Sequence, residues 1–162
     1  MFPGYARRLP MVPEAPKVAQ VATVVIDTQI VMDWLVFADA RVAPLVSALE
    51  TGQLAWIGRA AMQAELFHVL GRGVAADRQP DLARIEAAFA RHCRMIEADP
   101  APAVRLVCRD PDDQQFIDLA IAERADWLLS RDKAVLALRK RALTFGLKIC
   151  TPEVWIQSLA SS

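Results

Sequence analysis

The sequence predicts a single α/β domain with a mainly parallel central sheet of four to five strands and helices on both faces. Short apolar segments rich in β-branched residues recur along the chain, which is typical of strands buried on both faces. Longer segments with helical periodicity separate them, and this alternation is what parallel pairing requires. No repeat or linker divides the 162 residues, so one domain is expected.

The strands are expected where apolar residues run without helical spacing. The first is VATVVI, which is short, apolar and β-branched. The other four segments are QLAWIG, AVRLVC, DWLLS and LKIC, at residues 53–58, 103–108, 126–130 and 147–150. Together with residues 21–26, they would supply the strands of the sheet.

Helices are expected between these strands, over residues 29–37, 43–50, 60–70, 80–95, 112–123 and 133–140. Gly71 and Gly73 end the third of them. A terminal helix begins with Thr151 as its cap and Pro152 at its first position. Four prolines in residues 1–20 predict a flexible tail, which leaves residues 21–160 as the folded domain.

Composition excludes several classes of protein. The formal net charge is zero, so no global field attracts nucleic acid or a membrane surface. The three cysteines are scattered without CxxC spacing, which argues against a disulfide framework and against a zinc site. No apolar run approaches the ~18 residues of a membrane span. We therefore expect a cytoplasmic protein with reduced thiols.

Two acids follow predicted strands directly. Asp27 ends the first strand, and Asp132 ends the segment WLLSRD. In open α/β sheets, sites form beyond the carboxyl ends of the strands, so both acids are expected at one edge. Either residue alone could equally be a turn residue or a helix cap.

Two further acids lie on apolar helix faces. Glu65 completes the spacing i, i+3, i+4, i+7, i+8 of a core-facing stripe, and Asp113 has apolar residues at the same offsets after it. A buried carboxylate is costly unless its charge is compensated. The alternatives are an edge position for Glu65 and an ordinary helix start for Asp110, Asp112 and Asp113. Four converging carboxylates would repel one another, and Mg²⁺ or Mn²⁺ would relieve that repulsion.

Four stretches carry a resemblance to a known family: VVIDTQI, AELFHVL, RDPDDQQFIDLAIAERADWLLSRDKAVL and ICTPEVW. With them the chain resembles a PIN domain over roughly residues 21–155, and in particular the toxin component of bacterial toxin–antitoxin pairs. The third stretch is the most specific. The resemblance implies a ribonuclease that cuts single-stranded RNA with Mg²⁺ or Mn²⁺, an antitoxin protein as partner, and a homodimer.

The resemblance also assigns residues. Asp27, Glu65, Asp113 and Asp132 match the catalytic and metal-binding acids of the family. Gln29 stands where the family usually has Asn, and Gln114 stands where a further acid is common. We expect supporting roles for Gln29, Ser130, Asp110 and Asp112, and weaker RNA contacts from Arg109 and Arg131.

Other functions remain to be weighed. A phosphatase of the aspartyl-phosphate type needs a second Asp two residues after Asp27, where Gln29 stands, and a receiver domain needs an acidic pair that is not clear here. Neither GxGxxG nor a P-loop is present. Glu65-x-x-His68 has the spacing of a di-iron ligand pair, but only one copy occurs. The main alternative is a catalytically degenerate PIN-like module that binds RNA or protein without cutting.

Overall fold

The computed structural model describes residues 21–161, so the predicted flexible tail over residues 1–20 lies outside the described range. Within that range, five strands form one all-parallel sheet in the order β3-β2-β1-β4-β5. They are β1 Ala22–Ile26, β2 Leu54–Gly58, β3 Cys93–Met95, β4 Trp127–Leu129 and β5 Lys148–Cys150. The predicted α/β class with a parallel sheet is confirmed.

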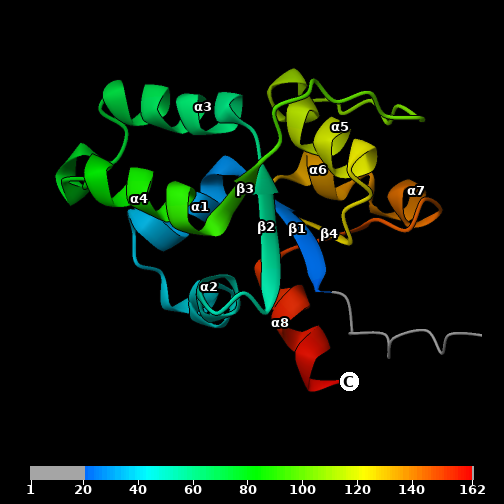
Figure 1. Ribbon diagram of the computed structural model, residues 1–162, viewed down its shortest axis with the longest axis horizontal. Helices are drawn as coiled ribbons and strands as arrows, with labels where there is room; N and C mark the ends of the chain where they lie inside the picture. The colour runs from blue at the N-terminus through cyan, green and yellow to red at the C-terminus, as the bar shows by residue number, and fades with distance from the viewer. Residues whose placement is uncertain (1–20, 162) are drawn as a thin grey trace, which may run out of the picture.

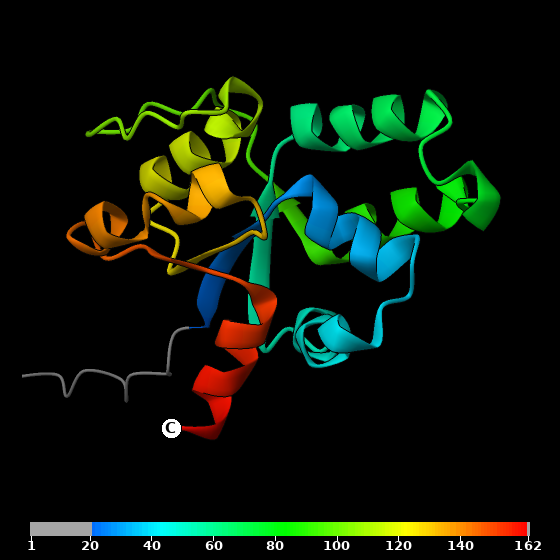
Figure 2. The same cartoon turned by 180° about the vertical axis from the view of Figure 1, so that it is seen from behind.

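Helices cover both faces of this sheet (Figure 1, Figure 2). One layer contains α1 Thr28–Leu35, α2 Ala43–Glu50, α3 Ala60–Gly71, α4 Leu82–His92 and α8 Pro152–Ala160. The other contains α5 Gln114–Ala122, α6 Lys133–Leu136 and α7 Arg139–Leu143. None of the helices within residues 21–161 combines the length and apolar character needed to cross a bilayer.

Strand β1 shows why the sheet has two cores. Val24 and Ile26 belong to the core under α1–α4, and Val25 between them belongs to the core under α5–α7. This alternation follows from the two-residue repeat of a strand, and it explains why every β1 position after Thr23 is apolar. In the first core Trp34 meets Trp56 edge-on, with 5.6 Å between the ring centroids. These tryptophans therefore serve packing.

The predicted strand over residues 103–108 is wrong, and the helix predicted to continue to residue 95 ends at His92. Cys93–Met95 instead pairs with Trp56–Gly58 as the edge strand β3. Gly58 permits this pairing, since a Cβ there would stand 2.9 Å from the Cys93 sulfur. Residues 106–108 bond to a side chain instead of a neighbouring strand. The Gln114 carboxamide donates to the Leu106 carbonyl and accepts from the Cys108 N–H, both at 2.7 Å.

Candidate metal centre

Two acids stand at the carboxyl ends of adjacent strands. Asp27 follows β1 and caps α1 by accepting a hydrogen bond from the Ile30 N–H at 3.1 Å. Asp132 comes three residues after the end of β4 and caps α6 by accepting from the Ala134 N–H at 2.7 Å. Because β1 and β4 are hydrogen-bonded neighbours, the chain returns the two acids to the same edge of the sheet.

Ser130 joins these two acids. Its side chain is fully buried, and its hydroxyl donates to the Asp27 carboxylate while accepting from the Asp132 N–H at 3.0 Å. One hydroxyl therefore fixes the Asp27 carboxylate and the backbone that carries Asp132. This geometry is compatible with the supporting role predicted for Ser130.

The turn before α5 supplies further acids. Pro111–Asp113 forms a short 3-10 helix capped by Asp110, which accepts from the Asp112 N–H at 3.0 Å. Carboxylate oxygens of Asp110, Asp113 and Asp132 lie within 4.8 Å of one another. These three residues are called the acid cluster below. Within residues 21–161, no salt bridge reaches any member of the acid cluster, and Asp112 is exposed beside it.

The electrostatics follow from this crowding. Burial raises the pKa of Asp113 to about 7, and repulsion from Asp132, Asp110 and Asp27 adds to the effect. Burial also raises the pKa of Asp27 to about 6, although hydrogen bonds from Ser130 and Ile30 act in the opposite direction. The site thus gathers carboxylates whose charge no salt bridge from the described part of the chain compensates. A hard divalent cation fits such an all-oxygen donor set.

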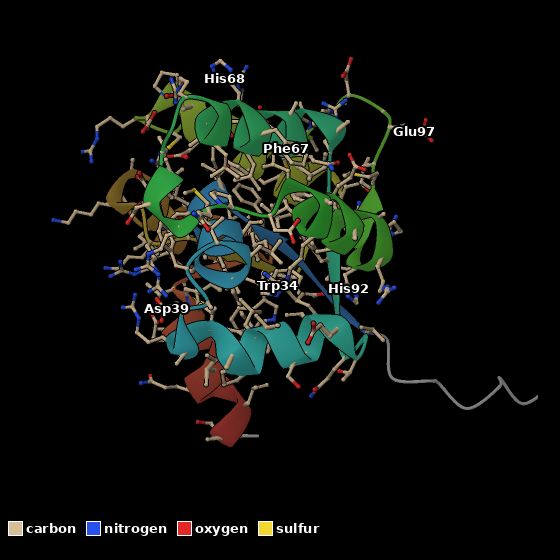
Figure 3. The ribbon with its side chains drawn as sticks, turned by 90° about the vertical axis from the view of Figure 1, so that its left-hand side faces the viewer. Trp34, Asp39, Phe67, His68, His92 and Glu97 are labelled. Atoms are coloured by element: carbon tan, nitrogen blue, oxygen red, sulfur yellow. The ribbon has the colours of Figure 1, made fainter. Side chains whose placement is uncertain are left out.

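Glu65 lies beside this group but is not part of the acid cluster. Its side chain is partly buried on α3, and one oxygen accepts from the Thr28 hydroxyl at 3.1 Å and from the Gln115 amide at 3.0 Å. Thr28 follows Asp27 directly, so the glutamate is anchored to the same strand end. His68 is exposed on the outer side of α3 (Figure 3), which separates it from the acid cluster.

A family model described as PIN domain matches residues 23–134, which is more than half of the chain. The chain belongs to the PIN domain family. A search of curated proteins found no match. The matched region contains β1, β4 and the turn before α5, and with them every member of the acid cluster.

Gln29 and Gln114, the two departures from the pattern expected of a PIN domain, both form hydrogen bonds within the protein. Gln29 donates from its side-chain amide to Asp33 at 3.0 Å. Gln114 holds the loop at Leu106 and Cys108, and it also donates to Asp118 at 2.9 Å. Gln114 therefore clamps a loop of the PIN domain at the position where the family resemblance leads one to expect an acid.

Sequence reasoning missed a buried ion pair next to the acid cluster. Asp33 on α1 is only 5% exposed, and its carboxylate accepts from the Arg131 guanidinium at 3.0 Å. Arg131 also donates to Glu153 at the start of α8 at 2.7 Å. Its carboxylate partners raise the pKa of the guanidinium further. Arg109 is exposed, and RNA contacts by Arg109 and Arg131 stay predictions.

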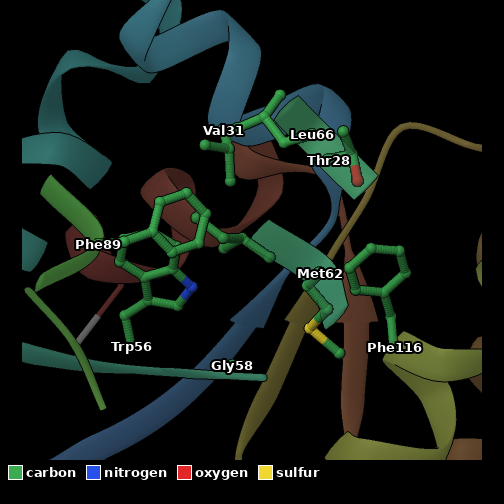
Figure 4. Close-up of a pocket in the computed structure, with 9 residues that line it drawn as sticks. Thr28, Val31, Trp56, Gly58, Met62, Leu66, Phe89 and Phe116 are labelled. Atoms are coloured by element: carbon green, nitrogen blue, oxygen red, sulfur yellow. The ribbon is translucent and has the colours of Figure 1, made fainter. Parts of the chain in front are cut away.

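Two hollows adjoin the strand ends of this PIN domain. An open cleft is lined by Asp27, Asp113 and Asp132 together with Thr28, Gln29, Met32, Val69, Val74 and Arg131. Thr28 also borders a small apolar cavity between Trp56, Met62, Leu66, Phe89 and Phe116 (Figure 4). The cavity offers about 10 Å³ to the centre of a water molecule, so it has room for no more than one. Of these two hollows, the open cleft is therefore the one with room for a ligand larger than water.

Proposed function

We propose that this PIN domain is an endoribonuclease that hydrolyses phosphodiester bonds of single-stranded RNA with Mg²⁺ or Mn²⁺. The observation that carries the proposal is the convergence of Asp110, Asp113 and Asp132 without a compensating cation among the described residues. A structural ion pair lies close by at Asp33, so the protein can neutralise a buried acid where only stability is needed. Asp27 and Glu65 complete the proposed set of ligands.

The residues of the chain have distinct roles in this reaction. Bound Mg²⁺ or Mn²⁺ would stabilise the charge that develops on the scissile phosphate and activate a water molecule. Asp113 and Asp132 would hold the ion, with Asp27 behind them. Ser130 keeps the Asp27 carboxylate in place, and the caps on α1 and α6 fix the backbone beside both acids. No nucleophilic side chain is needed.

The biological role that we propose is that of a toxin in a toxin–antitoxin pair. The support is membership of the PIN domain family together with the resemblance to its toxin components. In this role the protein acts in the cytoplasm, is held inactive by an antitoxin protein, and forms a homodimer. Expression of the wild-type chain should arrest bacterial growth, expression of Asp113→Asn should not, and a small neighbouring gene should relieve the arrest.

The decisive experiment uses purified protein, single-stranded RNA and Mn²⁺. We expect cleavage that stops when the ion is chelated and that Asp27→Asn or Asp113→Asn abolishes. Binding without cleavage in the presence of Mn²⁺ would refute the nuclease and support the degenerate binding module instead. Double-stranded RNA and single-stranded DNA of the same sequence serve as comparison substrates.

A further inference from the structure

The cleft that contains the acids also has an apolar surface, which phosphodiester hydrolysis itself does not require. Met32 on α1, Val69 on α3 and Val74 in the following loop line it together with Asp27, Asp113 and Asp132. Val74 is 43% exposed, Val69 is partly buried against the core, and Met32 is a core residue with 4% of its surface exposed. These three residues are called the apolar wall below. A phosphate or a metal ion gains little from such a wall, whereas an apolar part of a substrate can pack against it.

One polar group of known orientation belongs to the same cleft. The exposed side chain of Gln29 donates its amide nitrogen Nε2 to the Asp33 carboxylate at 3.0 Å. The Asp33 carboxylate is paired with Arg131 and accepts only, so the amide nitrogen of Gln29 must face it. No donor within residues 21–161 occupies the remaining oxygen, Oε1. Gln29 therefore presents a hydrogen-bond acceptor to the cleft.

A nucleobase matches this combination of surfaces. It has apolar faces that pack on aliphatic side chains and a polar edge that forms hydrogen bonds. The cleft is rich in carboxylate oxygens, which accept hydrogen bonds. A base whose polar edge carries an exocyclic amine is therefore favoured over a base whose edge has only carbonyl groups and a ring N–H. Adenine, cytosine and guanine each present an exocyclic amine, whereas uracil does not.

We propose that Met32, Val69 and Val74 receive one base of the RNA strand beside the scissile phosphate, and that Gln29 Oε1 accepts a hydrogen bond from its exocyclic amine. This subsite rests on the proposed ribonuclease function and adds a base preference to it. It makes Gln29 a specificity-determining residue. The hydrogen bond from Gln29 to Asp33 orients the carboxamide, so that Oε1 rather than Nε2 is available to the substrate.

Removing the exocyclic amine from one base of the substrate tests the proposed hydrogen bond to Gln29 Oε1. For each position that flanks the cleavage site, two oligoribonucleotides are compared. One carries adenosine at that position, and the other carries purine riboside, which lacks the 6-amino group. We expect wild-type kcat/KM to fall about threefold to tenfold for purine riboside at one position. Gln29→Met should cut both oligonucleotides at equal rates, whatever its absolute rate, and its Mn²⁺ affinity should match that of the wild type.

A pair of valine variants tests the apolar wall. Val74→Ala removes two methyl groups from the wall and should raise KM about threefold with little change in kcat. Val104→Ala is the matched control, since Val104 is 39% exposed but lies outside the cleft. Equal KM values for both variants and the wild type would contradict the wall's part in binding.

The outcomes separate the subsite from the nuclease. Cleavage of both oligonucleotides at equal wild-type rates at every position would overturn the subsite and leave the ribonuclease standing. If no RNA is cut, the same oligonucleotides are compared by fluorescence anisotropy with Ca²⁺ present. Weaker binding of purine riboside by the wild type but not by Gln29→Met would then support the subsite while refuting the nuclease, and equal binding would overturn both.

Discussion

Asp33 and the acid cluster are two buried or partly buried carboxylate sites that the protein treats differently. Asp33 receives a guanidinium from Arg131 at 3.0 Å and an amide from Gln29 at 3.0 Å. Asp110 and Asp132 each accept from a backbone N–H group, and no salt bridge from residues 21–161 reaches Asp110, Asp113 or Asp132. Two adjacent loop residues show the contrast: Arg131 forms a salt bridge with Asp33, whereas Asp132 forms none with any residue between 21 and 161.

On the proposed function, the difference separates an acid that serves stability from acids that would bind a cation. A buried acid that only has to hold helices together is paired, because an unpaired one costs several kcal/mol. Burial and mutual repulsion instead raise the pKa of Asp113 to about 7, and this cost is retained in the folded chain. Unrelieved repulsion of this kind is what a site for a divalent cation requires.

The largest expected effect comes from neutralising one carboxylate of the proposed metal site. If the proposed function holds, Asp113→Asn and Asp27→Asn should each lower the rate of single-stranded RNA cleavage by at least about 100-fold, because the proposed divalent cation would be bound less tightly. Initial rates on a labelled oligonucleotide with Mn²⁺ measure the effect. Glu123→Gln, which neutralises an exposed acid at the far end of α5, should cut at the wild-type rate.

The same substitution at Asp33 should act on stability. Asp33→Asn removes the buried charge that pairs with the partly exposed Arg131 guanidinium, so the free energy of unfolding should fall by about 2–3 kcal/mol. Urea denaturation of the metal-free protein measures this change. Asp113→Asn should not destabilise the protein in the same assay, and equal destabilisation by both variants would remove the contrast between the two sites.

Gln114 offers a test with a smaller effect. Its carboxamide hydrogen-bonds the backbone at Leu106 and Cys108, so Gln114→Ala should lower the free energy of unfolding by about 1–2 kcal/mol. Mn²⁺ affinity should stay within about twofold of the wild type, because the clamp is not a ligand. A large loss of Mn²⁺ affinity with unchanged stability would place Gln114 in the metal site instead.

The smallest expected effect is a dependence on pH. The pKa of Asp113 is raised from 3.8 to about 7 in the folded protein, so the folded state binds the proton more tightly than the unfolded state does. Stability is therefore lost as the pH rises from about 4 to about 7. Without metal, Asp113→Asn should melt on the order of 2 °C above the wild type at pH 8 and at the same temperature at pH 4.

Added Mn²⁺ should change this ranking. At pH 8 it should raise the melting temperature of the wild type above that of Asp113→Asn, since the bound cation stabilises the folded state. Differential scanning calorimetry at both pH values, with and without the ion, follows the change. A wild type that melts above the variant in chelator at pH 8 would show that the Asp113 charge is compensated within the protein.

The sequence predicts the main architecture because its signals are local. Four of the five predicted strands, the predicted helix at residues 43–50 and the Thr151–Pro152 start of α8 reappear in the structure. Strand β3 has only three residues, and its place depends on close approach to Gly58 across the sheet. That information is not present in the residues around Cys93, whose spacing favours a continued helix.

The candidate site divides in the same way. Strand-end positions and apolar stripes bring Asp27, Asp113, Asp132 and Glu65 to attention, because those patterns depend on spacing along the chain. The partner of Asp33 stands 98 positions away, and no local pattern distinguishes this acid from an exposed helix residue. The two contacts of Gln114 with the 106–108 backbone likewise require the folded loop.

Calorimetric titration of the chelator-treated protein with Mn²⁺ at pH 7.5 tests the central claim most directly. We predict saturable binding to the wild type, at least tenfold weaker binding to Asp113→Asn, and wild-type binding to Glu123→Gln. The claim that the acid cluster is a divalent-cation site would be contradicted if the wild type bound no Mn²⁺, or if Asp113→Asn bound it as tightly as the wild type.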